Sequence, residues 1–517
     1  MDSGSQNQQK EEPSMSTFRG TMQRCYRGCL ANARLVQALF AIILLLAVVH
    51  LDDFTFDASS DTLVARGDPE LAYYRDMVDR FDEHEFVVLT YTPRDRPLFE
   101  PETLDHLGRL QQALTEIPGV SDVTSILDVP LVRSPPVPLT QLADGYRTLR
   151  DEADPALARE ELTTSPIFSE LLVSRDGSTT ALRVDLAAQP ELEAARARRD
   201  RALANPSAPG VDPSAAEEHY RAVKEQAKTE RSRLISEIRS VRDRFDGDTR
   251  IFLGGLPMIT ADVIQLVERD MQRFGVAVVL LLAVALFLFF RSLYWVLVPL
   301  ATVGATLLIV VGTLGFLGVP ATAISANFVS LIAIVTISFT IHLIARYREL
   351  AREPEWTHVE RVYETMRSKL APVLYTAMTT GVAFASLIAS DIVPVIQFGW
   401  IMLLGIGVAF FVTYGLFAGL LVLIPAPEDS GRTDSTPYLT RVLCRLVLRR
   451  KAWILAISLV SGLAAAWFVP GLAIENRFLD YFREGSEIHD GMEVIDRKLG
   501  GTIPIDIVLQ YPAWQPD

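Results

Sequence analysis

Cysteine is scarce in this sequence, and the long region between the first two apolar runs has none. The three cysteines are Cys25, Cys29 and Cys444. Region 52–273 must therefore fold without disulfide bonds. Cys25 and Cys29 lack the second ligand pair that accompanies most zinc-binding cysteine pairs. We interpret them as reduced thiols near the membrane, with a metal pair and lipidation sites as the alternatives.

Catalytic and nucleotide-binding motifs are also missing. The chain has no HExxH motif, no Walker loop, no nucleophile elbow and no cysteine–histidine pair with metal-binding spacing. The GGL stretch at 254–256 is typical of a turn from a strand into a helix rather than of a phosphate-binding loop. We therefore expect no enzyme activity, no cofactor and no bound metal.

Charged residues make up 22% of the chain but are nearly absent from seven long apolar runs. Each run is long enough, or nearly so, to cross a hydrocarbon core of about 30 Å. The last run but one is longer than a single span needs, so we expect its outer end to be interfacial or tilted. The predicted spans are 34–51, 274–290, 293–317, 322–344, 371–389, 394–424 and 452–470.

Lysine and arginine are absent from the short connections 317–321 and 390–393. They are frequent in the tail 1–33, after the fourth span, and in the loop 425–451. Because basic loops stay in the cytoplasm, this asymmetry predicts a cytoplasmic N-terminus and places region 52–273 outside. The first run lies more than thirty residues from the start and lacks a cleavage site, so it is interpreted as a membrane anchor.

The outer region 52–273 is predicted to be an α+β domain. Strand-like segments at 85–91, 119–126, 179–186 and 249–255 alternate with helical segments at 101–117 and 215–245. Two β-α-β halves indicate a ferredoxin-like fold. The region accounts for about the whole net charge of −14, which argues against a nucleic-acid partner. Cationic or neutral amphiphiles suit this charge, although solubility alone also explains it.

A repeat joins the two ends of the chain. Segments 61–91 and 480–511 align with a one-residue gap, and each follows an apolar run. Both predict an extended entry, a glycine-containing turn, an amphipathic helix and a strand. Parallel repeats are a known plan of transporters. We expect 471–517 to begin a second outer domain whose remainder lies beyond the chain or comes from a partner.

The sequence resembles the first half of a resistance-nodulation-division (RND) permease. The residues that carry the resemblance are TISFTIHLIARYREL at 336–350, PVLYTAMTT at 372–380 and DIVPVIQFG at 391–399. Within this superfamily the chain is similar to predicted exporters of the mycobacterial membrane protein large (MMPL) family and to hopanoid transporters. The resemblance implies twelve spans, two outer porter-type domains and proton-driven export of lipids or other hydrophobic compounds. Region 274–424 also resembles a sterol-sensing domain.

The resemblance places Ser338 where many relatives carry a proton-relay aspartate. Serine cannot titrate, so coupling through this position is open. At 100° per residue, Asn327, Ser330, Ser338 and His342 share one side of the fourth span. Polar side chains in lipid need partners, so we expect this stripe to face the bundle interior. It could line a hydrated path with His342 as its titratable group, or it could only bond neighbouring helices.

Two further features lie on the fifth and sixth spans. Gly381, Ala385 and Ala389 recur every fourth residue and predict a seam of close helix packing. Asp391 lies in the outer turn before Pro394, where it could receive protons from outside or cap a helix.

The sequence therefore predicts a polytopic α-helical membrane protein with an extracytoplasmic α+β domain. We expect a multi-pass protein of a bacterial inner membrane that exports lipid-like, hydrophobic or amphiphilic compounds. A lipid or sterol sensor, or an accessory subunit that does not pump, is the alternative. Membrane lipids and the substrate are the expected partners, and a homo-oligomer or a periplasmic partner protein remains open.

Overall fold

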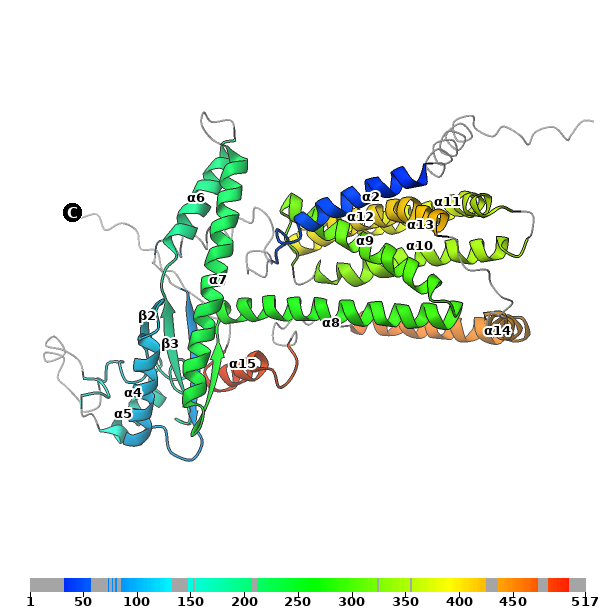
Figure 1. Ribbon diagram of the computed structural model, residues 1–517. Helices are drawn as coiled ribbons and strands as arrows, with labels where there is room; N and C mark the ends of the chain where they lie inside the picture. The colour runs from blue at the N-terminus through cyan, green and yellow to red at the C-terminus, as the bar shows by residue number, and fades with distance from the viewer. Residues whose placement is uncertain are drawn as a thin grey trace, which may run out of the picture. The chain divides into compact units, whose positions relative to one another are not determined.

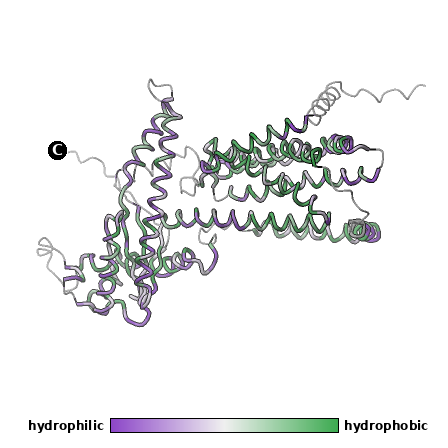
Figure 2. The backbone as a smooth tube through the Cα atoms, viewed as in Figure 1, coloured by the Kyte–Doolittle hydropathy of each residue, from purple (hydrophilic) through white to green (hydrophobic). Residues whose placement is uncertain are grey.

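The computed structural model divides the chain into two compact units, formed by residues 1–68 with 264–472 and by residues 69–263 with 473–517. Apolar residues dominate the long helices of the first unit, whereas polar and apolar residues alternate along the helices of the second (Figure 2). The residues described are 32–56, 73, 77, 80, 85–132, 147–151, 154–206, 212–322, 325–353, 356–424, 436–472 and 482–501, without the side chains of 268 and 436–440.

The second unit contains a four-stranded antiparallel sheet with the order β2-β3-β1-β4 (Figure 1). Its strands are β1 (Phe86–Pro93), β2 (Val120–Thr124), β3 (Thr180–Leu186) and β4 (Thr249–Gly254). All four strands lie within or next to the segments that the sequence predicts. They are rich in β-branched and aromatic residues, which suit a pleated, half-buried surface.

Helices in this unit connect and cover the strands. Helix α4 (Pro101–Thr115) connects β1 to β2, and α7 (Pro213–Phe245) precedes β4. Leucines spaced three or four residues apart on α4 are fully buried against the strands: Leu107, Leu110 and Leu114. The smaller helices are α5 (Pro155–Thr164) and α6 (Pro190–Ala204). Helix α6 contains the arginine-rich stretch 195–201 and packs on α7. The guanidinium of Arg199 lies over the ring of Tyr220 on α7.

Helix α15 (Glu487–Lys498), which follows the last apolar run, packs on this sheet. Its Gly491 approaches β4 so closely that an added Cβ would lie 3.2 Å from the carbonyl oxygen of Leu253. Glu487 pairs with Arg242 and Arg239 of α7, and Lys498 pairs with Asp176. Helix α15, which lies far along the chain from the four strands, thus packs as part of the same domain.

His106 gives this domain a pH dependence. Its Nδ1 lies 2.9 Å from the hydroxyl of Tyr91, and burial lowers its pKa from the usual 6.5. Below pH 6.5 the unfolded chain therefore binds more protons than the folded protein does. The contribution of His106 to stability is complete above that pH and is lost as the pH falls through the pKa of the histidine in the folded state. We expect the thermal unfolding temperature to fall between pH 7 and pH 5, and His106→Gln to reduce this fall. The exposed His219 offers a control, since His219→Gln should leave the pH profile unchanged.

Six helices within the described residues are long and apolar enough to cross a membrane: Leu256–Phe290, Tyr294–Leu317, Ser325–Leu350, His358–Ala389, Val393–Leu423 and Arg441–Gly471. An additional apolar helix, α2 (Ala33–Val49), has 17 residues. Each of these seven helices overlaps one of the seven apolar runs from which the sequence predicts spans.

The first of the six, α8 (Leu256–Phe290), and the next, α9 (Tyr294–Leu317), are single helices, as Figure 1 shows. Helix α10 (Phe328–Leu350) follows the short η3 (Ser325–Asn327), and α11 (His358–Ala385) runs into η4 (Ser386–Ala389). The next span joins α12 (Val393–Val412), the π-helix η5 (Thr413–Phe417) and α13 (Ala418–Leu423). The last, α14 (Thr436–Phe468), leads into η6 (Val469–Gly471).

The predicted loop 425–451 is partly helical, because α14 already begins at Thr436. The backbone leaves helical geometry at Arg450, just before the apolar run. The segment before this break has apolar residues at Val442, Leu446 and Leu448 among basic residues, which allows a helix that the loop prediction missed.

Candidate functional site

A cavity of about 380 Å³ lies in the first unit, between α8 and the start of α10. Four residues of α8 line it, at positions 267, 270, 271 and 274. This spacing places them on one face of the helix. Ala326 and Asn327 of η3, with Val329 and Ser330 of α10, line the opposite side. Its size suits a small molecule or part of a lipid.

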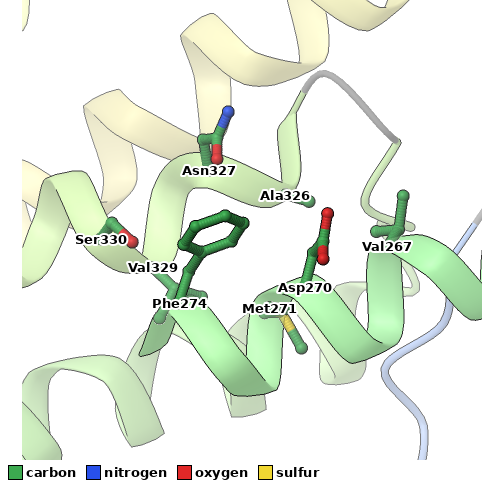
Figure 3. A pocket seen from close by; sticks show the side chains of 8 residues that line it. All are labelled: Val267, Asp270, Met271, Phe274, Ala326, Asn327, Val329 and Ser330. Atoms are coloured by element: carbon green, nitrogen blue, oxygen red, sulfur yellow. The ribbon is translucent and has the colours of Figure 1, made fainter. Parts of the chain in front are cut away.

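The cavity combines one acid, two neutral polar groups and an apolar wall. In Figure 3 the carboxylate of Asp270 and the ring of Phe274 both rise from α8 toward η3 and α10. Asp270 comes before the apolar run of α8, and Phe274 begins that run. Along α8 the acid therefore lies on the interface side of the aromatic ring.

The polar side chains of this cavity have unused hydrogen-bonding capacity. Asn327 occupies the N-cap position of α10, yet its side chain makes no capping hydrogen bond. Among the described residues, no hydrogen bond or ion pair joins Asp270, Asn327 or Ser330 to the protein. These groups are free to bind something else.

The sequence analysis selected Asn327 and Ser330 but missed Asp270. The signal was present, because residues 267, 270, 271 and 274 form an i, i+3, i+4, i+7 face. A boundary of the outer domain at 273 separates Phe274 from the other three residues of this face. Helix α8 continues through that boundary.

The polar stripe on α10 does not face the bundle interior within the described residues. Ser338, His342 and Asn327 are exposed, and Ser330 is half-buried. The buried side of α10 carries the large apolar residues Phe328 and Phe339, which are almost completely buried. Burying these two phenylalanines stabilises the fold more than burying the stripe would, because the hydrophobic free energy grows with the apolar area removed from water.

The buried polar groups of α10 are threonines instead. The Thr336 hydroxyl donates to the carbonyl oxygen of Ile332 at 2.7 Å, and the Thr340 hydroxyl donates to that of Ile337 at 2.9 Å. These groups find partners within their own helix and can be buried without cost to a neighbour. The helical wheel groups residues by side, but it does not say which side the neighbours cover.

One segment of the chain matches the model of a known family. Residues 212–436 match the MMPL family. The match covers both sides of the cavity and the whole stripe, and it confirms the resemblance to RND-type permeases. MMPL-family proteins are transporters of lipid-like or hydrophobic compounds. Together with the six apolar helices, the match indicates a multi-pass membrane protein. No curated protein matches the chain.

The predicted seam on α11 of the MMPL segment shows graded burial. Gly381 is buried, Ala385 is half-buried and Ala389 is exposed. A Cβ added at Gly381 would lie 3.5 Å from Leu403, an ordinary contact. A closer approach between α11 and α12 occurs at Gly399, where an added Cβ would lie 2.8 Å from the carbonyl oxygen of Phe384.

Asp391 of the MMPL segment is exposed in the turn between η4 and α12. The N-cap of α12 is Ile392, and no side chain caps this helix. The capping role that the sequence allows for Asp391 is therefore not found. Its role as a proton entry stays a prediction.

A second histidine of the MMPL segment, His358, makes contacts that sequence reasoning did not anticipate. Its Nε2 lies 2.8 Å from the carbonyl oxygen of Leu421, and its Nδ1 lies 3.1 Å from the hydroxyl of Tyr347. A carbonyl oxygen only accepts, so Nε2 donates to Leu421, while Nδ1 bonds the tyrosine hydroxyl. The His358 side chain thereby ties α11 to α10 and to α13.

One group of possible metal ligands occurs among the described residues, outside the MMPL segment. His489, Asp490 and Glu493 have ligand atoms within 4.8 Å of one another. All three belong to α15, and Glu493 already pairs with Arg497. The Nδ1 atom of His489 is buried without a hydrogen-bond partner and lies 3.5 Å from a carboxylate oxygen of Asp490. Cys25, Cys29, most of segment 61–91 and the two ends of segment 480–511 lie outside the described residues, while Cys444 is exposed.

Proposed function

We propose that this protein is a secondary exporter that moves lipid-like, hydrophobic or amphiphilic compounds from or across a bacterial inner membrane. The N-terminus lies in the cytoplasm in this proposal, and the proton gradient drives export. The observation that carries the proposal is the cavity between α8 and α10, because its acid-to-aromatic polarity matches a molecule with a polar head and an apolar tail. The family match supports the same class of activity.

The second unit would act as the extracytoplasmic, porter-type domain. Its strand order β2-β3-β1-β4, with antiparallel neighbours, supports a ferredoxin-like fold. Helix α15 would then be the start of the second repeat.

Blocking the cavity tests the exporter proposal. Val329→Trp adds a large ring to the wall, and we expect it to reduce export of a fluorescent single-chain amphiphile about 10-fold by loss of bound substrate. Ile334→Trp is the matched control, because Ile334 lies on the same helix, is 50% exposed and does not line the cavity. Equal export by both variants would contradict a role for the cavity.

The polar stripe would line the proton path, with His342 as its titratable member. We expect His342→Ala to flatten the dependence of export on pH, and Ser338→Asp to shift it by adding a second titratable group on the same face. Export rates measured between pH 5.5 and pH 8 provide the comparison. Unchanged profiles in both variants would remove the stripe from the coupling mechanism.

A lipid sensor or accessory subunit is the second candidate. It is favoured by Ser338, which leaves α10 without a carboxylate in the stripe. A protein that binds amphiphiles at the cavity but moves none of them under any gradient would support this alternative.

A further inference from the structure

We propose that the cavity between α8 and α10 selects amphiphiles whose head group is a protonated primary amine. The inference rests on the proposed function and names its substrate class. It follows from three features of the cavity: the charge of its lining, the number of its hydrogen-bond acceptors, and the position of Phe274.

The lining carries one negative charge and no positive one. Asp270 is the only ionisable residue among the eight that line the cavity. No ion pair joins Asp270 to its neighbours Arg269 and Arg273, and Arg269 contacts Gln265 instead. A half-buried carboxylate beside apolar residues gains most from a ligand that brings the opposite charge. An anionic head group would meet repulsion without compensation.

The acceptors match a primary ammonium. Such a group has three N–H donors and no acceptor. Asp270 and Asn327 each present an oxygen that has no partner among the described residues, while Ser330 lies beyond the Phe274 ring (Figure 3). An alcohol has one donor and would leave acceptors unpaired, which disfavours it. A quaternary ammonium has the charge but no N–H.

Phe274 lies where the head group meets the tail. It is four residues after Asp270 and therefore on the same face of α8, as Figure 3 shows. The ring face attracts a nearby cation, and the ring body offers apolar area to the first methylene groups of the tail. The ligand would enter with its amine at the membrane interface and its chain along the apolar run.

Photo-crosslinking in lipid nanodiscs tests this selectivity without any gradient. The probes are diazirine-bearing dodecylamine, its N-trimethyl analogue, dodecanol and dodecanoate. We expect the amine to label peptides containing 267–274 or 326–330 at least about 10-fold more than the other three. Asp270→Asn, which keeps shape and removes charge, should abolish the preference, and Asp391→Asn should preserve it.

Equal labelling by amine and alcohol, or an amine preference that survives Asp270→Asn, would overturn the proposal. If Asp270→Asn prevented folding, Asn327→Ala would serve instead, with a smaller preference for the amine over the trimethyl analogue expected and an unchanged preference contradicting the inference. Selective labelling by a protein that exports nothing would uphold the amine site and overturn the exporter.

Discussion

Gly312→Leu should unfold the contact between α2 and α9. A Cβ added at Gly312 would lie 2.4 Å from the carbonyl oxygen of Ala47 and 2.6 Å from its Cα. These are backbone atoms, so no side-chain rotation can relieve the clash. The same holds at Gly315, where an added Cβ would lie 2.1 Å from the carbonyl oxygen of His50. We expect a loss of about 3 kcal/mol, at the upper end of the range for overpacked sites.

Gly304→Leu is the matched control for this substitution. Gly304 lies on the same helix, but a Cβ added there meets nothing within 4 Å. Thermal unfolding in detergent, followed by gel filtration, compares the two variants. Equal unfolding temperatures would show that α2 and α9 are not packed through their glycines.

Glu487→Lys should release α15 from the domain on which it packs. Glu487 is the shared partner of Arg239 and Arg242, whose side chains are only 21% and 14% exposed. A lysine would place a third positive charge beside two half-buried ones. Asp262, at 2.6 Å from Arg239, could compensate one of them. We expect roughly 2 kcal/mol of local destabilisation, which makes hydrogen exchange in α15 about 30-fold faster.

Glu493→Lys provides the comparison within α15. Glu493 pairs with Arg497 on the same helix, so its replacement removes an exposed pair of small value. Hydrogen exchange of peptides covering 487–498 measures both variants. If Glu493→Lys loosened α15 as much as Glu487→Lys, the ion pairs to α7 would not be the contacts that hold the helix.

The strongest sequence signals reappear in the structure for a physical reason. Apolar runs such as 274–290 and 293–317 can satisfy their backbone groups in a membrane only as helices, so composition alone predicts them. The strands near 86–93 and 249–254 alternate or run apolar between turns, and they too lie where the sequence places them. The first part of helix α14 was harder to predict from the sequence, because a charged amphipathic helix resembles a charged loop in composition.

The site was less predictable than the spans. The side of α10 that carries Ser338 and His342 could be found from residue spacing, but its exposure depends on where α9 and α12 lie. Asp270 and Asn327 are 57 positions apart by residue number, and only the packing of α8 beside α10 brings them to one cavity. Pairing of this kind is set by tertiary structure and leaves no local pattern.

The most direct test of the account measures transport by the purified protein in proteoliposomes under an imposed proton gradient. A fluorescent alkylamine placed in one leaflet reports movement when it leaves that leaflet. The account predicts movement that requires the gradient, falls about 10-fold in Val329→Trp and persists in Ile334→Trp. Movement no faster than in protein-free liposomes, or movement indifferent to both the gradient and the cavity variant, would contradict it.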